Sequence, residues 1–376
     1  METSTRKVLQ FAPFVGDEEY AAIRDCFDAN WITEGPKSKL FVAKLRELMD
    51  VKHAALAPNG TLAIYLGLRA MNIGPGDEII VPAFTFLGSA SAVEMTGATP
   101  IFCDIDPATL QVSAEHFAAR LTARTKAIMP VHIYGMTCDM APIMELARQQ
   151  GLLVIEDAAQ AIGVRYNNQH AGTFGDVGTF SFFADKTITT GEGGLVVTNN
   201  ERFAENLLYL RNQGRIDRGS FIHPQMGYNF RLTDLQAAVG LAQLAKLNEI
   251  TRIKHELLAH YHEQLDNLPQ VRFINVTPKS TYIPFRAAIY AERAPELIQY
   301  MEAHNIQTRT FFYPLHRQPA FGYLKQDSKY AGPLEDRDFP GAVYAYENGV
   351  CLPSYPALPV EDLNYVCEQI KAFYQT

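Results

Sequence analysis

Two segments near the middle of the chain hold residues whose types and spacing could do chemistry. The first is LVIEDAAQ at 153–160, in which an apolar run ends in two acids. Ligands of open α/β sheets bind beyond the carboxyl ends of the strands, so Asp157 lies where a binding site would be. A carboxylate at that point could equally cap a following helix or turn, and this segment alone supports both interpretations.

The second segment is GTFSFFADKTITTGEGG at 178–194, which carries a single lysine, Lys186, ahead of three glycines. Phe182, Phe183 and Ile188 flank this lysine, and shielding from water would lower its pKa and make the neutral amine available for imine chemistry. Lysines at the ends of strands more often extend into the solvent. Lys186 therefore needs support from the rest of the sequence.

Together the two segments match the central motif of one family, residue for residue. The sequence resembles the sugar aminotransferases of the DegT/DnrJ/EryC1/StrS family, which are pyridoxal-phosphate enzymes of fold type I, like aspartate aminotransferase. The resemblance runs from WITEGPKSKLFVAKLRELM at 31–49 to VCLPSYPAL at 350–358. It implies pyridoxal 5'-phosphate as the cofactor, glutamate as the amino donor, and a keto or aldehyde sugar as the acceptor.

The resemblance gives the two central residues distinct roles. Lys186 matches the lysine that forms the Schiff base with the cofactor, and Asp157 matches the acid that pairs with its pyridine nitrogen. That pairing keeps the nitrogen protonated, so the ring can accept the electrons released when a C–H bond of the substrate breaks. Lys186, once displaced by the incoming amine, would act as general base and then acid. A histidine replaces this lysine in the sugar-dehydratase offshoot of the family, so transamination is favoured.

Further cofactor contacts are implied by position. The phosphate needs backbone N–H groups at a helix start and hydroxyl donors, which PNGTLAIYLGLRA at 58–70 can supply. Asn229, in GYNFRLTDLQAA at 227–238, matches an asparagine that reaches the phosphate from the partner subunit, which implies a homodimer. Phe86 on its own would be interpreted as a core residue. The other matched residues are Gly60, Thr61 and Ser181 for the phosphate, Gln160 for the ring hydroxyl and Phe86 for the ring face.

Three residues are expected to contact the substrate from the C-terminal part of the chain. Arg286 lies in STYIPFRAAIY at 280–290, which lacks the tryptophan or histidine often seen in the family, and many members carry no charge at the position of Arg286. Tyr313 and His316 follow it, and all three would face the cofactor across a domain boundary, a usual place for sites. Tyr313 and His316 could also be packing residues before a turn, and Arg286 could be a solvated strand residue.

The substrate itself has two candidate classes. The segments DKTITTGEGG at 185–194 and RTFFYPLHRQP at 309–319 resemble perosamine-synthase-like enzymes, which act on a nucleotide-linked 4-keto-6-deoxy sugar for surface polysaccharides such as lipopolysaccharide. The competing class is an unactivated acidic sugar, such as 8-oxo-Kdo aminated to 8-amino-Kdo, whose carboxylate Arg286 could bind. A non-catalytic regulatory protein on the same scaffold is the alternative of another class. Retention of Lys186 and Asp157 favours the enzyme.

The elements that must position these residues follow from periodicity. Between about 50 and 200, short apolar runs alternate with amphipathic stretches, which predicts an α/β domain with a mixed, mostly parallel sheet flanked by helices. We expect strands at 53–58, 78–82, 99–105, 126–134, 152–157, 178–183 and 194–198. One long helix is expected over 233–265, starting at the capping-box pair Thr233 and Gln236. A large cofactor-binding domain would span 1–250 and a smaller α+β domain 251–376, and the N-terminal segment could pack elsewhere.

Composition excludes several other classes of protein. The net charge of −8, with no run of Lys or Arg, argues against a nucleic-acid surface. The five cysteines form no CxxC pair, so neither a disulfide framework nor a metal site is expected. No apolar run approaches the roughly 20 residues of a membrane span or resembles a signal peptide. These features predict a cytoplasmic enzyme.

Overall fold

A seven-stranded sheet forms the centre of the larger part of the molecule. The computed structural model describes residues 7–215, 219, 221–328, 330 and 332–375. The strand order is β1-β9-β8-β5-β4-β2-β3; β9 is antiparallel to both neighbours, and the other adjacent pairs are parallel. The strands are β1 (His53–Ala57), β2 (Glu78–Pro82), β3 (Thr99–Cys103), β4 (Thr125–Ile128), β5 (Leu153–Asp157), β8 (Val177–Ser181) and β9 (Gly194–Thr198). The predicted mixed, mostly parallel sheet and its seven strands are confirmed, although the strand expected over 126–134 ends at Ile128.

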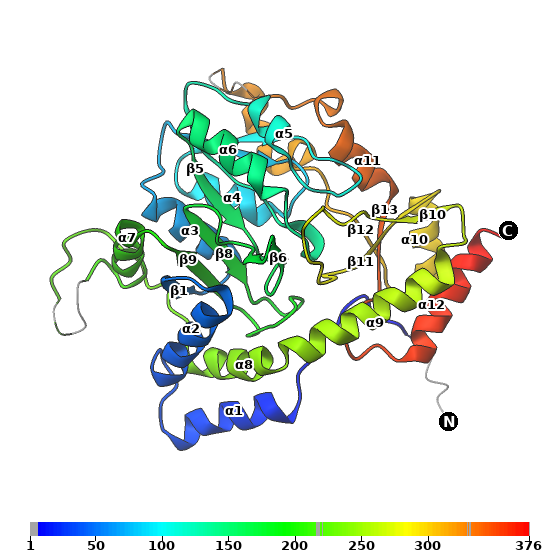
Figure 1. Ribbon diagram of the computed structural model, residues 1–376, viewed down its shortest axis with the longest axis horizontal. Helices are drawn as coiled ribbons and strands as arrows, with labels where there is room; N and C mark the ends of the chain where they lie inside the picture. Colours follow the sequence, from blue (N-terminus) through cyan, green and yellow to red (C-terminus); the bar gives the residue numbers. More distant parts are fainter. Residues whose placement is uncertain (1–6, 216–218, 220, 329, 331, 376) are drawn as a thin grey trace.

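Helices cover this sheet on both faces, as Figure 1 shows for α6 in front of it and for α3 and α4 behind it. Strands buried on both faces read as continuous apolar runs, and all five residues of β2 and of β9 are buried. The covering helices are α2 (Pro36–Met49), α3 (Gly60–Ala70), α4 (Leu87–Met95), α5 (Ala114–Ala118), α6 (Met140–Gln150) and α7 (Glu201–Arg211). Short elements connect them: η1 (Ile133–Gly135), β6 (Arg165–Tyr166) and β7 (Gln169–His170).

A second, antiparallel sheet lies at the C-terminal side, in the order β10-β11-β13-β12. Apolar residues of α9, α10 and α12 pack together with its strands. The strands are β10 (Val271–Phe273), β11 (Ala287–Ala291), β12 (Arg309–Thr310) and β13 (Gly349–Leu352). The helices are α10 (Ala294–Ala303), α11 (Pro340–Asn348) and α12 (Val360–Phe373), with short turns η2 (Leu315–Arg317), η3 (Pro319–Gln326) and η4 (Asp336–Asp338).

The single long helix expected over 233–265 is wrong, because two helices form there. They are α8 (Asp234–Ala245) and α9 (Leu247–Leu265), separated at Lys246, whose backbone angles leave the helical region. The side chain of Lys246 reaches Glu19 of α1 (Asp17–Asp28), with its Nζ 2.6 Å from a carboxylate oxygen. The capping box of Thr233 and Gln236 forms as predicted. The break lets α8 pack on α1 and α2 while α9 runs toward the second sheet (Figure 1).

The N-terminal segment packs beside the second sheet rather than the first. Val8 forms a parallel bridge with Ile306, and its side chain is part of the apolar core shared by α9, α10 and α12. In the other direction, Phe285 and Phe311 belong to the core of the large sheet. Each core therefore contains residues from both the N-terminal and the C-terminal parts of the chain. The division into two domains at residue 250 stays a prediction.

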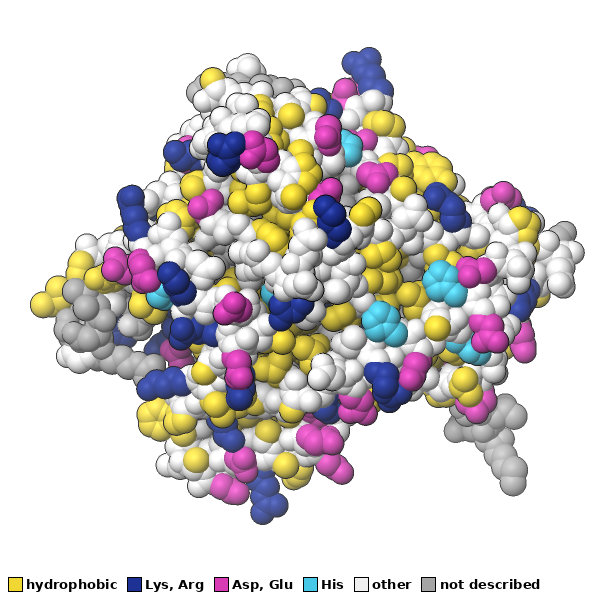
Figure 2. Space-filling view, in the orientation of Figure 1, with side chains coloured by type: hydrophobic (Ala, Val, Ile, Leu, Met, Phe, Trp, Pro, Cys, Tyr) yellow, Lys and Arg dark blue, Asp and Glu magenta, His cyan; other side chains and the backbone are white. Residues whose placement is uncertain are grey.

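The surface mixes charges of both signs. Figure 2 shows Lys and Arg side chains scattered among Asp, Glu and apolar atoms on the visible face, without a continuous basic patch among the residues described there. All five cysteines are buried and unpaired. None of the helices in the described part of the chain is long and apolar enough to cross a membrane.

Candidate active site

A cavity of about 640 Å³ opens beside the carboxyl ends of β5 and β8 and is closed on one side by residues of the second sheet. It brings together residues that lie far apart in the sequence. Of the residues predicted to form the site, those lining the cavity are Gly60, Thr61, Phe86, Asp157, Gln160, Ser181, Lys186 and Arg286. Asn229, Tyr313 and His316 do not line it in this subunit.

Lys186 presents a largely buried amine to this cavity. Its Nζ lies 3.6 Å from Oδ1 of Asp185 and 4.7 Å from the ring centroid of Phe285. Burial lowers the pKa of Lys186, the positive charge of Arg286 acts in the same direction, and Asp185 opposes both. The expected lowering is thus found, but the shielding ring is Phe285. Phe182 instead packs on Phe41, 5.4 Å away between ring centroids.

Asp157 ends β5 with a carboxylate that is only 5% exposed. Its Oδ2 accepts a hydrogen bond of 2.6 Å from the hydroxyl of Ser89, and its Oδ1 accepts one of 3.1 Å from the backbone N–H of Ala159. The contact with Ala159 is the local turn bond that the alternative interpretation expects. Ser89 comes from α4, so a second element of the fold holds the carboxylate in place. Asp157 therefore accepts a hydrogen bond within the turn and also lines the cavity.

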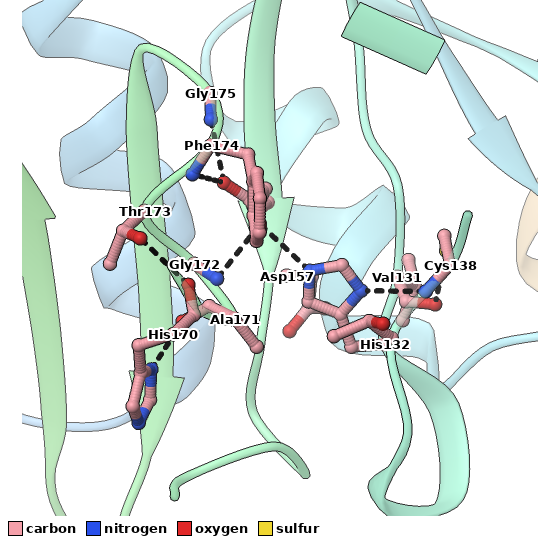
Figure 3. A network of polar contacts seen from close by, with 12 residues as sticks. Val131, His132, Cys138, Asp157, His170, Ala171, Gly172, Thr173, Phe174 and Gly175 are labelled. Carbon is pink, nitrogen blue, oxygen red and sulfur yellow. Dashed lines mark hydrogen bonds and ion pairs between the residues drawn. The ribbon is translucent and has the colours of Figure 1, made fainter. Parts of the chain in front are cut away.

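Behind Asp157, a buried network holds the end of β5 in place (Figure 3). Glu156 points to the other face of the strand and accepts backbone N–H bonds from the turn after β7, at 2.8 Å from Gly172, 2.6 Å from Phe174 and 2.7 Å from Gly175. The Nε2 of His132 lies 2.8 Å from Oε2 of the same carboxylate, the oxygen that also accepts from Gly172. These contacts satisfy an acid that is fully buried.

The same network fixes the protonation of His132. The backbone N–H of Cys138 donates to Nδ1 of His132 at 3.2 Å, so Nε2 carries the proton and donates to Glu156. The backbone of His132 then donates to the carbonyl of Asp157 at 2.9 Å, and the N–H of Asp157 donates to Pro130 at 2.9 Å. The loop after β4 and the end of β5 are therefore one rigid unit that carries Asp157.

The start of α3 provides a cradle for an anion. Gly60 and Thr61 are its first residues, and their N–H groups cannot bond within the helix. A Cβ at Gly60 would lie 2.8 Å from the Cβ of Ser181, so only glycine lets the end of β8 approach this closely. The side chain of Asn59 caps the helix by accepting from Leu62 at 2.9 Å. Backbone donors and the hydroxyls of Thr61 and Ser181 together suit a phosphate group.

Phe86 and Gln160 complete the walls around the space between Asp157 and this cradle. Phe86 is 64% exposed, which is high for a phenylalanine, and its ring offers an apolar face to the cavity. The Oε1 of Gln160 accepts from the backbone N–H of Tyr134 at 2.7 Å, so its amide N–H groups are left as donors. A ring face, an amide donor, an acid, an amine and a phosphate cradle fit pyridoxal 5'-phosphate.

Arg286 lines the cavity, and its guanidinium is engaged within the protein. It forms an ion pair with Asp185 and lies 4.5 Å from the ring centroid of Phe285 and 5.6 Å from that of Phe11. At 6% exposure it is not the solvated strand residue of one interpretation. Its assignment to a substrate carboxylate stays a prediction, because Asp185 already supplies a carboxylate.

Tyr313 and His316 pack elsewhere, so the expectation that they face the cavity is wrong for this subunit. Tyr313 lies against Tyr346, with 5.0 Å between ring centroids. His316 stacks on Phe339 at 4.1 Å, and its Nε2 lies 3.0 Å from Asp336. Burial lowers the pKa of His316. The chain turns after β12, so that Phe312 rather than Tyr313 faces the cavity.

Asn229 lies on the surface, away from the cavity. Its Oδ1 accepts a hydrogen bond of 2.8 Å from Nε of Arg231, and its backbone bridges to Asn212. In the part of the chain that the structure describes, Asn229 is not among the residues that line the cavity at the start of α3. A contact with the site of a partner subunit stays a prediction.

Several residues at the cavity were not predicted. Asp185 directly precedes Lys186, and Ser89 follows Phe86 by about one helical turn, so both lie within segments that were singled out. Phe285 and Arg309 reach the cavity only through the second sheet, and Phe11 of the N-terminal segment packs on Arg286 and Arg309 without lining the cavity. No local pattern marks these three residues. The further residues of the wall include Thr85, Glu192, Thr310 and Phe312.

Comparisons with known proteins agree with this geometry. Residues 13–371 match the DegT/DnrJ/EryC1/StrS aminotransferase family. The chain is 39% identical to the GDP-perosamine synthase of Escherichia coli O157:H7 over 97% of this chain and 98% of that protein. Among solved structures, the aminotransferase TlmJ from Streptoalloteichus hindustanus has a TM-score of 0.91 at 30% identity, covering 98% of both chains. S. venezuelae DesV, solved with a ketimine intermediate, has a TM-score of 0.88 at 32% identity, covering 96% of this chain and 95% of that one.

Proposed function

Because the chain belongs to the DegT/DnrJ/EryC1/StrS aminotransferase family and is a pyridoxal-phosphate-dependent sugar aminotransferase, we propose that it transfers the amino group of glutamate to a nucleotide-linked 4-keto-6-deoxy sugar. The reaction would be a cytoplasmic step in the synthesis of a surface polysaccharide. The observation that carries this proposal is the identity to a GDP-perosamine synthase over nearly the full length of both chains.

The residues of the cavity can perform the proton transfers of such a reaction. Bound pyridoxal phosphate supplies an electron sink for the carbon that loses its hydrogen. Lys186 is poised as the base, because burial lowers its pKa and leaves more of the amine neutral near pH 7. Asp157, held by Ser89, would keep a proton on the ring nitrogen of the cofactor. The apolar rings of Phe86, Phe285 and Phe312 would exclude water from the amine.

The competing acceptor is an unactivated acidic sugar, and the pairing of Arg286 weighs against it. A substrate carboxylate would have to replace Asp185 at a guanidinium that is already buried and packed on two aromatic rings. Removing one partner of a buried ion pair is costly. The sugar ring of a nucleotide-linked 4-keto-6-deoxy sugar is neutral, so the ion pair between Arg286 and Asp185 can stay intact when it binds.

A panel of keto sugars tests the acceptor class. We expect purified protein with glutamate to aminate a nucleotide-linked 4-keto-6-deoxy sugar and to lose this activity when the nucleotide is removed, since much of the binding energy would come from the nucleotide. Product formation would be followed by mass spectrometry. Amination of a free acidic keto sugar in preference to all nucleotide-linked ones would refute the proposed acceptor.

Arg286→Lys gives a second, independent test of the acceptor. Lysine keeps the charge beside Asp185 but lacks the planar fork that binds a carboxylate through two nitrogens. If the acceptor is a nucleotide-linked sugar, we expect its KM to change by less than about threefold, while an acidic sugar held by Arg286 would lose on the order of tenfold or more. The KM of glutamate in the same variant serves as the internal control.

We further propose a homodimer, in which Asn229 of each subunit contacts the phosphate in the other subunit's site. The support is its surface position, away from the cavity of its own subunit. We expect Asn229→Ala to weaken cofactor binding by about 1–3 kcal/mol, the cost of one hydrogen bond to a charged group. Cofactor titration measures this loss. Asn364→Ala is the matched control, because Asn364 is also exposed and bonds a neighbouring side chain, His260, at 2.8 Å.

Sedimentation of the wild-type protein completes the test of the dimer. A fully active monomer, or an Asn229→Ala protein that retains the cofactor as well as the Asn364→Ala protein does, would contradict the shared site.

A further inference from the structure

Of the lysine and arginine side chains that line the cavity, one has no carboxylate partner within the described part of the chain. Asp185 and Arg286 neutralise each other, and Asp157 is held by Ser89 and a backbone N–H beside the space that suits the pyridine ring. Arg309 also lines the cavity, from β12, and its side chain is exposed. Within the described part of the chain, no carboxylate lies within ion-pairing distance of Arg309.

Arg309 is nevertheless held in a defined place. Its guanidinium lies 5.2 Å from the ring centroid of Phe11, and the guanidinium of Arg286 lies 5.6 Å from the same ring. Phe11 belongs to the N-terminal segment. Hydrogen bonds of 2.9 Å, from the N–H of Val8 to Asn305 and from Gln307 to the carbonyl of Val8, fix this segment to the connection between α10 and β12. The ring thus orients Arg309 toward the cavity without neutralising its charge.

The aromatic contacts of the three cations distinguish Arg309 from Arg286. Lys186 and Arg286 both pack on Phe285, while Arg286 and Arg309 both pack on Phe11. Arg309 thus shares a ring with Arg286 and none with the amine of Lys186. We expect an anion bound at Arg309 to be carried by a part of the substrate that lies away from its reacting carbon.

An acidic amino donor has such an anion. Its α-carboxylate is attached to the carbon that bears the amino group, so it must lie close to Lys186, whereas its side-chain carboxylate extends away from that carbon. A guanidinium matches a carboxylate through two parallel hydrogen bonds. We propose that Arg309 binds the side-chain carboxylate of the amino donor and so selects glutamate over neutral amino acids. This inference rests on glutamate being the donor in the proposed function.

The test compares donors in the first half-reaction. Wild type, Arg309→Gln and Arg309→Lys, each loaded with cofactor, would be mixed with glutamate or alanine, and the change in cofactor absorbance followed in a single turnover. We expect Arg309→Gln to lower kcat/KM for glutamate by about 10- to 100-fold, the loss of a charge-assisted pair, and to change that for alanine by less than about twofold. The kcat/KM of Arg309→Lys for glutamate should lie between those of the wild type and of Arg309→Gln, because lysine keeps the charge but lacks the planar guanidinium.

A binding measurement gives a readout that needs no turnover. Glutarate has two carboxylates and no amino group, and calorimetry should show that it binds the cofactor-loaded wild type more tightly than the Arg309→Gln protein. Arg272→Gln is the matched control, because Arg272 packs on an aromatic ring of the same sheet, 4.8 Å from the centroid of Tyr290, but does not line the cavity. We expect Arg272→Gln to behave as wild type in both assays.

The possible results separate this inference from the proposed function. The role of Arg309 would be overturned if the wild type prefers glutamate while Arg309→Gln has the same kcat/KM for glutamate and the same affinity for glutarate as the wild type. The proposed function would then still stand. A variant in which only the KM of the keto sugar rises would also overturn this role and would place Arg309 at the acceptor. A wild type that accepts no amino group from glutamate would instead refute the proposed donor.

Discussion

Replacement of Lys186 with alanine is expected to lower aminotransferase turnover by at least about 10⁴-fold, which is the upper range for the loss of a positioned acid and base. Lys186 is the lysine that lines the cavity, and burial lowers its pKa, so its amine is the group that can take and return a proton there. The cradle formed by Gly60, Thr61 and Ser181 is untouched by the change. The variant should therefore still bind the cofactor, which absorbance after gel filtration would measure.

Lys254→Met provides the control for Lys186→Ala. Lys254 is also a buried lysine, on α9, and burial lowers its pKa to about 7. It lines a small cavity next to Lys186, Asp185 and Arg286 but not the cavity of the candidate site. We expect Lys254→Met to retain turnover within about tenfold, since it removes a buried amine without removing the proton-transfer group. Appreciable turnover in Lys186→Ala would disprove the central assignment.

Replacement of Asp157 with asparagine is expected to lower turnover by about 10²- to 10⁴-fold without unfolding the protein. The amide keeps an oxygen that can accept from Ser89 or from the N–H of Ala159, so the local structure should persist. An amide has no negative charge with which to hold a proton on the ring nitrogen of the cofactor. Single-turnover rates, with thermal unfolding as a check of the fold, would measure the two effects separately.

Asp176→Asn is the matched control for Asp157→Asn. Asp176 precedes β8 in the same sheet and accepts from the backbone N–H of Val154 at 2.8 Å, but it does not line the cavity. We expect its replacement to affect stability more than turnover. Wild-type rates in Asp157→Asn would show that this acid only supports the turn at Ala159.

The predicted site residues that line the cavity share a simple geometry. Asp157 and Ser181 end neighbouring parallel strands, and Gly60 and Thr61 begin a helix that follows a strand, so the topology of the sheet alone gathers them at one edge. The pattern that predicted the sheet therefore also predicted the edge at which the cavity lies.

The residues that were missed or misplaced depend on packing between distant segments. Phe285 lies just before β11, and the pairing of β11 with β13 brings it to Lys186. β13 has only four residues and shows no distinct sequence pattern. Tyr313 and Phe312 are neighbours in one aromatic run, and only the turn after β12 decides which of them faces the cavity. Local sequence patterns carry no information on either point.

The pairing of Val8 with Ile306 has a consequence for the order in which the molecule can be completed. Val8 is buried in the core of the second sheet, yet most of the chain must be synthesised before its partner exists. Contacts this far apart in sequence form slowly, because a long loop must close first. The segment that carries Phe11 to Arg286 and Arg309 is therefore among the first made, but it can be placed only after residue 306 has been synthesised, so these two arginines of the cavity wall gain their shared aromatic contact late.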